Sequence, residues 1–141
     1  SFLLSVGGNV RTVGGKGKEN TPWNVGIQNP DITSPQYSLY TLALTDLSLV
    51  SSGSYERYYT VDGKTYHHII DPATLMPSEY YTSVSIICED SGMADLLSTA
   101  LFNMSFEDGI ELIEGLDNTE ALWVFSDASM KYSEGFEDLI K

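Results

Sequence analysis

Cysteine and basic residues are scarce in this chain of 141 residues. Its one cysteine, Cys88, excludes an intrachain disulfide and a cysteine-based zinc site. Seven basic residues stand against twenty acidic ones, and the resulting net charge of −13 would repel a phosphate backbone. Nucleic acid is therefore not an expected partner. No apolar run approaches the ~20 residues that a membrane-spanning helix needs.

The length suits one domain with its own core, and we expect residues 1–141 to form a single domain. Cys88 lies in the apolar run VSIIC, where a small buried side chain is its expected role. The opening residues FLLSV have the composition of a strand already under way. We therefore expect the sequence to be part of a longer protein.

The order of apolar and polar residues predicts an α+β fold with a mostly antiparallel sheet. Strands are expected over residues 23–27, 39–44, 83–88 and 121–125, with 130–136 as a further partner. Ser91 can cap a helix, and Ser105 can cap a second helix that ends at Gly115. An apolar stripe expected to face the core recurs at helical spacing in the first helix: Met93, Leu96, Leu97, Ala100, Leu101 and Met104. Two amphipathic helices packed on one face of the sheet are the expected result.

A β-hairpin is the clearest local signal. The segments YERYYTV and KTYHHII are separated by Asp62-Gly63, the favoured dipeptide of a two-residue type I′ turn. This register places Tyr58 opposite His67 and Arg57 opposite His68. Because side chains alternate along a strand, the only two histidines of the chain point to opposite faces and cannot bind one metal together.

His68 is a candidate general base. Arg57 opposite it would favour the neutral imidazole that a base needs, and Asp71 could orient the ring or accept a hydrogen bond in the following turn. The alternative is a structural histidine at a strand end, followed by Asp-Pro as ordinary turn chemistry.

Asp95 and Thr99 form a candidate metal site, because residues four apart lie on the same side of a helix. A carboxylate and a hydroxyl are hard oxygen ligands that suit Mg²⁺. The alternative is an Asp that only complements the helix dipole from the first turn. Gly7-Gly8-Asn9 could cradle a phosphate through backbone N–H groups, or could simply form a turn.

Five segments together resemble a known family. SVGGNVRTVG, PWNVGIQNP, SSGSYERYY, YHHIIDPATLMP and SVSIICEDSGMADLLSTALF are similar, in order and spacing, to the C-terminal half of the ApbE-type FAD:protein FMN transferases. The resemblance implies an enzyme that splits FAD between its phosphates. It would attach FMN through a phosphoester to a Thr or Ser hydroxyl of an acceptor protein and release AMP. It also implies Mg²⁺ as cofactor, and a place in the cell envelope on the outer side of the cytoplasmic membrane, often as an anchored lipoprotein.

Roles for individual residues follow from the same resemblance. His68 would take the proton from the acceptor hydroxyl, with Asp71 beside it, and Asp95 with Thr99 would hold Mg²⁺. The flavin would be bound by segments matching the family's GGN and SGxYER motifs: Gly7, Gly8, Asn9, Ser52, Gly53, Tyr55, Glu56 and Arg57. Leu75 is a departure, because many members have Gly at this position, and its larger side chain could reshape the loop beside His68.

Two other functions use the same residues. One is a flavin-binding lipoprotein domain without transfer, and the other is a Mg²⁺-dependent FAD pyrophosphatase that releases FMN and AMP. The family's N-terminal half, which supplies much of the flavin pocket, is absent from this sequence. We therefore expect the chain to fold, to be incomplete as a transferase, and to expose an apolar or aromatic patch.

Overall fold

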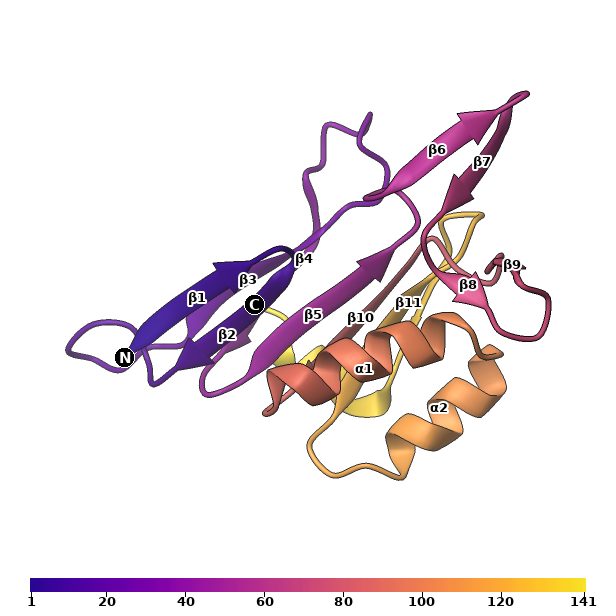
Figure 1. Cartoon of the computed structure of the whole chain (residues 1–141). Coiled ribbons are helices and arrows are strands. Elements are labelled where there is room, and N and C mark those ends of the chain that lie inside the picture. The colour runs from indigo at the N-terminus through magenta and orange to yellow at the C-terminus, as the bar shows by residue number, and fades with distance from the viewer.

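The computed structural model describes all 141 residues, and its core is an antiparallel sheet of six strands in the order β1-β2-β5-β10-β11-β12 (Figure 1). Three separate two-stranded sheets pair β3 with β4, β6 with β7 and β8 with β9, all antiparallel. The strands are β1 (Phe2–Val6), β2 (Asn9–Val13), β3 (Trp23–Gln28), β4 (Ser38–Leu44), β5 (Ser48–Gly53), β6 (Tyr58–Val61), β7 (Lys64–His67), β8 (Ile70–Asp71), β9 (Met76–Pro77), β10 (Ser83–Cys88), β11 (Glu120–Val124) and β12 (Met130–Tyr132). The helices are α1 (Ser91–Phe102), α2 (Phe106–Glu114) and the 3-10 helix η1 (Glu134–Leu139). The α+β prediction is confirmed.

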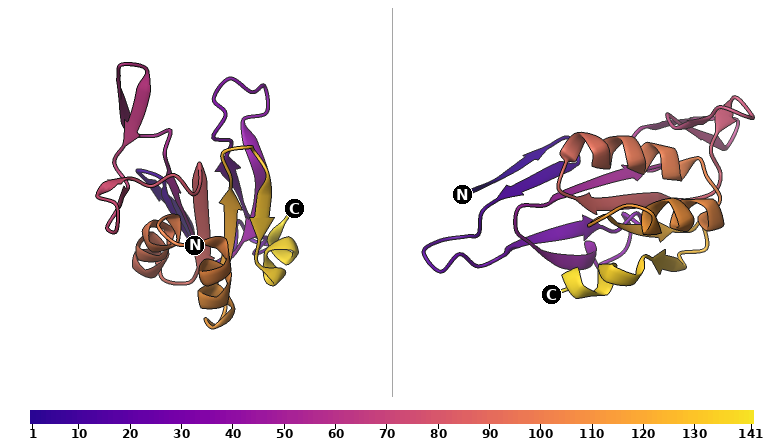
Figure 2. Two further views of the ribbon diagram at one scale, coloured as in Figure 1. Left: turned by 90° about the vertical axis from the view of Figure 1, so that its right-hand side faces the viewer. Right: turned by 90° about the horizontal axis from the view of Figure 1, so that it is seen from below.

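Both faces of the central sheet are covered. All six residues of β10 are buried, and alternate residues face opposite sides. Ile86 packs in the core that includes Trp123 and Leu101, whereas its neighbour Ile87 packs with Leu122 and Phe136. The first core lies under α1 and α2, as expected (Figure 2). The second core lies under the β3–β4 hairpin and η1, a covering that the sequence pattern did not predict.

The start of α1 and its buried face differ from the sequence-based prediction. Asp90 is the N-cap, since its carboxylate accepts a hydrogen bond of 2.8 Å from the backbone N–H of Met93, so Ser91 is the first helical residue. Leu97 is buried as predicted, but Leu96 is 63% exposed. The buried stripe includes the small residues Ala94 and Ser98, which allow α1 to lie close against β5 and β10. Met93 and Leu96 of the predicted stripe are therefore turned outward.

The second helix and the hairpin follow the predictions. Ser105 caps α2 by accepting from the N–H of Asp108 at 3.2 Å, and Gly115 is the C-cap. Strands β6 and β7 are joined by Asp62 and Gly63, both with positive φ, in the predicted register. The hairpin projects from the body of the molecule (Figure 1).

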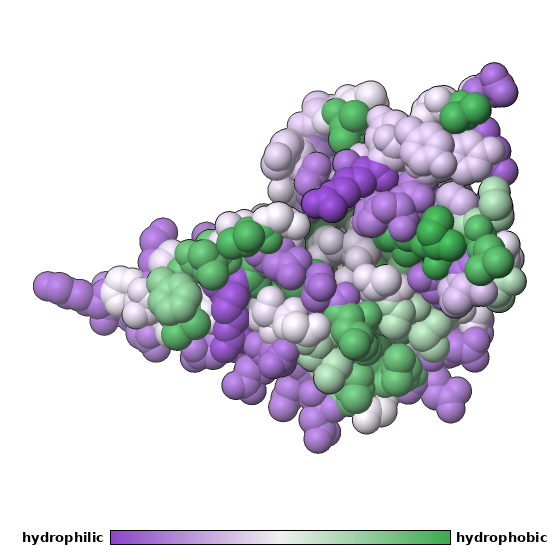
Figure 3. All heavy atoms as spheres, in the orientation of Figure 1, coloured by the Kyte–Doolittle hydropathy of each residue, from purple (hydrophilic) through white to green (hydrophobic).

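Cys88 is buried, as expected, and burial raises the pKa of its thiol. Neither α1 nor α2 is long and apolar enough to cross a membrane, and the same holds for every helix of the structure. Apolar side chains nevertheless gather on the surface, both on β1 and over α1 (Figure 3). The exposed apolar surface that we expected is thus present.

Candidate functional site

The two histidines have separate environments. His67 is buried, with its Nε2 2.8 Å from the carbonyl oxygen of Ser78 and its ring against the edge of Phe102. His68 is exposed, and its Nδ1 lies 3.3 Å from the carbonyl oxygen of Arg57. A carbonyl can only accept, so this contact favours the proton on Nδ1 and leaves Nε2 of the neutral ring free to take a proton. The register correctly predicts that His68 and Arg57 are neighbours, but His68 contacts the backbone carbonyl of Arg57.

Asp71 shapes the loop that follows His68. Its Oδ1 accepts a hydrogen bond of 2.8 Å from the N–H of Ala73, and its carbonyl accepts one of 2.8 Å from the N–H of Leu75. Of the two roles considered for Asp71, the structure shows the one in the turn. It shows no hydrogen bond between Asp71 and His68.

Asp95 and Thr99 both lie on the exposed side of α1, one turn apart. They line a groove of about 680 Å³ whose other wall is formed by Ile70 and Pro72 of the loop after His68. Asp95 is the fifth residue of α1, so the alternative in which it complements the dipole from the first turn is wrong. The fold thus brings the predicted metal ligands and the Asp-Pro loop to one groove.

Asn9, near the start of the chain, contacts the Asp95 carboxylate. Its side-chain amide donates to Oδ1 of Asp95 at 3.4 Å. Gly7 and Gly8 form the tight turn between β1 and β2 with φ of 56° and 96°, a conformation that places Asn9 at the start of β2. The GGN segment therefore lies against α1, the helix that carries the candidate metal ligands Asp95 and Thr99.

The donor atoms of this groove suit a hard cation but do not complete its coordination. The Asp95 carboxylate is exposed, and the Thr99 hydroxyl donates only a long hydrogen bond of 3.4 Å to the Asp95 carbonyl, so its lone pairs are available. No group of three or more His, Cys, Asp or Glu residues is placed to hold a metal ion. Magnesium typically binds to one or two protein carboxylates together with water and substrate phosphates, and the residues fit that pattern.

The SGxYER segment lies beside the GGN turn. Tyr55 and Glu56 line a hollow of about 370 Å³ together with Gly8. A Cβ on Gly53 would lie 2.5 Å from a ring carbon of Tyr55, so only glycine allows the ring to pack there. Burial raises the pKa of Tyr55, and the charge of Glu56 raises it further.

The remaining residues of this segment have other positions. The Ser52 hydroxyl lies 2.8 Å from the hydroxyl of Ser98 and joins β5 to α1. Arg57 is exposed at the base of the hairpin. Of the predicted flavin-binding residues, only Gly8, Tyr55 and Glu56 line the hollow, and none lines the groove of Asp95.

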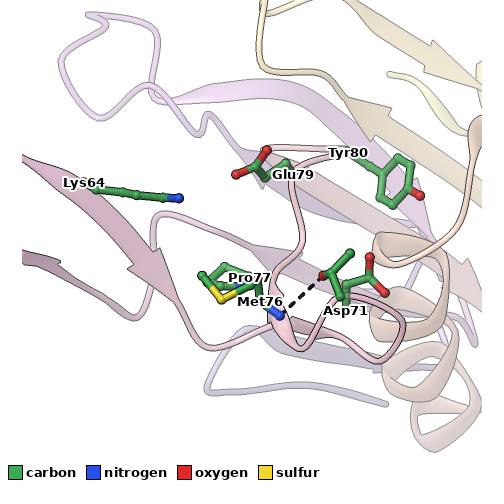
Figure 4. Close-up of a pocket in the computed structure, with 7 residues that line it drawn as sticks. Lys64, Asp71, Met76, Pro77, Glu79 and Tyr80 are labelled. Atoms are coloured by element: carbon green, nitrogen blue, oxygen red, sulfur yellow. Dashed lines mark hydrogen bonds between the residues drawn. The ribbon is translucent and has the colours of Figure 1, made fainter.

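A third hollow, of about 450 Å³, is lined by Asp71 of β8 and by residues of the chain that follows it (Figure 4). Asp71 belongs to it, and Lys64 of β7 extends toward it from the hairpin. Sequence reasoning missed Lys64, Glu79 and Tyr80 here. Their only signal in the sequence was their closeness to the Asp-Pro turn.

The whole arrangement matches a known family. The family model described as "ApbE family" matches residues 1–123, and the chain belongs to the ApbE family. A protein of Treponema pallidum named FAD:protein FMN transferase is 36% identical over 149 residues, which cover 100% of this chain and 41% of that protein. A protein of Klebsiella pneumoniae with the same name is 34% identical over 86% of this chain and 36% of that protein.

Solved structures agree with the fold. The ApbE protein of Thermotoga maritima superposes with a TM-score of 0.88 at 33% identity, over 99% of this chain and 45% of that one. The flavinyl transferase ApbE of Pseudomonas stutzeri in its apo form gives a TM-score of 0.73 at 27% identity, over 97% and 42%. The chain thus spans less than half the length of these relatives.

Proposed function

We propose that the full-length protein containing this chain is a Mg²⁺-dependent FAD:protein FMN transferase. One observation carries the proposal: the loop that follows His68 and the helix that carries Asp95 and Thr99 line the same groove. The names of the relatives in the ApbE family support the same activity.

The reaction needs one proton acceptor. The hydroxyl oxygen of an acceptor Thr or Ser forms a bond to the phosphorus on the FMN side of the pyrophosphate. The bond from that phosphorus to the bridging oxygen breaks, and AMP leaves with this oxygen. His68 accepts the hydroxyl proton on Nε2, because its Nδ1 is directed at the Arg57 carbonyl. Asp71 keeps the adjacent loop in place through its two turn hydrogen bonds.

Asp95 and Thr99 would hold Mg²⁺, and Asn9 would orient the Asp95 carboxylate. When bound, the ion would offset the negative charge that develops on the pyrophosphate. Gly8, with Tyr55 and Glu56, would contact the flavin nucleotide at the hollow on the β3–β4 side of the sheet, next to the turn that contains Gly7. We further propose, from the resemblance to the family, that the full-length protein acts in the cell envelope.

A gel experiment tests the proposal. Full-length protein is incubated with FAD, Mg²⁺ and a candidate acceptor, and a denaturing gel is examined for flavin fluorescence while AMP is measured. Protein-bound flavin with an equal amount of AMP is expected, and EDTA should abolish both. Free FMN with AMP would instead show a pyrophosphatase, and FAD binding without AMP would show a binding protein.

The matched variants are Asp95→Asn and Asp117→Asn. Both remove an exposed carboxylate, but only Asp95 lies at the groove. Asp95→Asn should lose Mg²⁺-dependent transfer, whereas Asp117→Asn should retain it. Equal activity of the two variants would contradict the assignment of the metal site.

A further inference from the structure

Leu75 is held in an unfavourable backbone conformation at the surface. Six residues other than glycine have positive φ, and four of them are Asn or Asp, which tolerate this region. Leu75, with φ of 59°, is the only large apolar residue among them. Its side chain is 77% exposed, so packing within this chain does not compensate for the strain.

The loop around Leu75 is fixed by its own hydrogen bonds. The N–H of Leu75 donates to the Asp71 carbonyl at 2.8 Å, and the N–H of Met76 donates to the Thr74 hydroxyl at 3.3 Å (Figure 4). Strained residues that a rigid surrounding holds in place are typical of functional sites. The loop thus presents an apolar side chain to the outside at a cost in stability.

Leu75 belongs to a larger apolar surface. Four exposed apolar residues lie on and beside this loop, and we call them the Leu75 patch: Ile70, Leu75, Met76 and Tyr80. Met76 and Tyr80 also line the hollow that contains Asp71 (Figure 4). Apolar side chains are visible on this side of the molecule in Figure 3. Such a patch around a hollow is typical of a site that binds an apolar side chain of a partner.

The position of the patch indicates which partner it binds. Ile70 lines the groove of Asp95 and Thr99, and the next residue, Asp71, lines the hollow beside the Leu75 patch. The groove and the hollow therefore adjoin at β8, which begins two residues after His68. If the phosphates of FAD occupy the groove, the hollow on Asp71 is left for the second substrate, close in the chain to His68.

We propose that the Leu75 patch binds the acceptor polypeptide, in an extended segment with a large apolar side chain close to the reactive hydroxyl. This inference rests on the proposed transferase function. Leu75 would act as a specificity residue: it contacts the acceptor and takes no part in binding FAD.

The test uses full-length protein and an array of synthetic peptides. Each peptide has a central Thr or Ser, and the neighbouring positions are varied among apolar, acidic and basic residues. The array is incubated with FAD and Mg²⁺, washed, and scanned for flavin fluorescence. Leu75→Gly is the main variant because glycine adopts positive φ without strain, so the fold is not at risk.

Wild-type protein should label peptides that have a large apolar residue beside the hydroxyl. Leu75→Gly should label them about tenfold less, the loss expected when one apolar contact is removed, with unchanged affinity for FAD. Ile32→Ala is the control, since Ile32 is 73% exposed and lies outside all three hollows. It should label as the wild type does.

Three results would overturn the inference. In the first, Leu75→Gly keeps the wild-type peptide preference. In the second, it weakens FAD binding as much as labelling, which would show that flavin or another part of the full-length protein covers the patch. In the third, the wild type flavinylates a protein acceptor but no peptide. A wild type that transfers FMN to neither would refute the transferase function itself, a separate result.

Discussion

The side-chain amide of Asn9 donates to a carboxylate oxygen of Asp95 over 3.4 Å, although 86 positions separate the two residues. Partners that orient a metal ligand typically change metal affinity 10- to 100-fold when removed, so Asn9→Ala should raise the Mg²⁺ concentration needed for half-maximal transfer by about tenfold. A Mg²⁺ titration of the full-length enzyme measures this. Asn24→Ala is the control, because Asn24 is exposed on β3. An unchanged Mg²⁺ requirement in Asn9→Ala would show that Asn9 does not orient a metal ligand.

Replacing His67 should lower the stability of the chain, whereas replacing His68 should abolish activity. His67→Ala removes the buried contact with the Ser78 carbonyl and the packing on Phe102, which should cost about 1–3 kcal/mol of unfolding free energy. His68→Ala removes an exposed ring and should leave this free energy nearly unchanged, but it should abolish transfer by the full-length protein. Urea unfolding of this chain measures the first effect, and the gel assay measures the second. The assignment fails if His68→Ala retains full transfer.

Leu75→Gly should raise the unfolding free energy of this chain by up to about 1 kcal/mol, because φ of 59° costs a leucine about 1–2 kcal/mol but does not cost glycine. The gain is reduced because glycine makes the unfolded chain more flexible. Gly115→Ala is a useful comparison: Gly115 has a right-handed helical conformation, so this change relieves no such strain. A lower urea midpoint for Leu75→Gly would show that the leucine side chain stabilises the loop.

Alkaline pH should destabilise the chain through Tyr81. Burial, with a smaller effect of Glu107, raises the pKa of Tyr81 to about 12, and its hydroxyl donates to the Met104 carbonyl at 3.0 Å. An unfolded tyrosine has a pKa of about 10. Between these values the folded state keeps a proton that the unfolded chain has lost. The contribution of Tyr81 to the unfolding free energy is therefore complete below pH ~10 and is lost as the pH rises toward ~12.

Tyr81→Phe isolates this effect from other tyrosines. Urea midpoints are measured at about pH 9 and about pH 11 for both proteins. The midpoint of the wild type should fall more than that of Tyr81→Phe. Equal decreases would assign the pH dependence to other groups, such as Tyr55, whose pKa is also raised.

Local signals in the sequence were sufficient for the elements that depend on few residues. The β6–β7 register follows from Asp62-Gly63 alone, and the ends of α2 follow from Ser105 and Gly115. The face of α1 could not be derived in this way. It is fixed by the fit of Ala94 and Ser98 against the sheet, and the larger side chains of Met93 and Leu96 remain outside.

The sequence predicts which residues belong to the candidate site, but not how they are arranged in space. Asp95 and Thr99 share a helix face by spacing alone, whereas the contact between Asn9 and Asp95 depends on the strand order β2-β5-β10. No local pattern fixes that order. The resemblance marked Leu75 as standing where many members have Gly, but the strain itself results from the hydrogen bonds that close the loop after Asp71.

The β6–β7 hairpin has consequences for motion. It pairs with no other strand, and all four residues of β6 are exposed. Two-stranded hairpins are only marginally stable in water, so its amides should exchange with deuterium far faster than those of β10. Because β7 leads directly into His68, this ring can change position on the timescale of hairpin opening while the two cores remain intact. Closure around two substrates would then need no rearrangement of the central sheet.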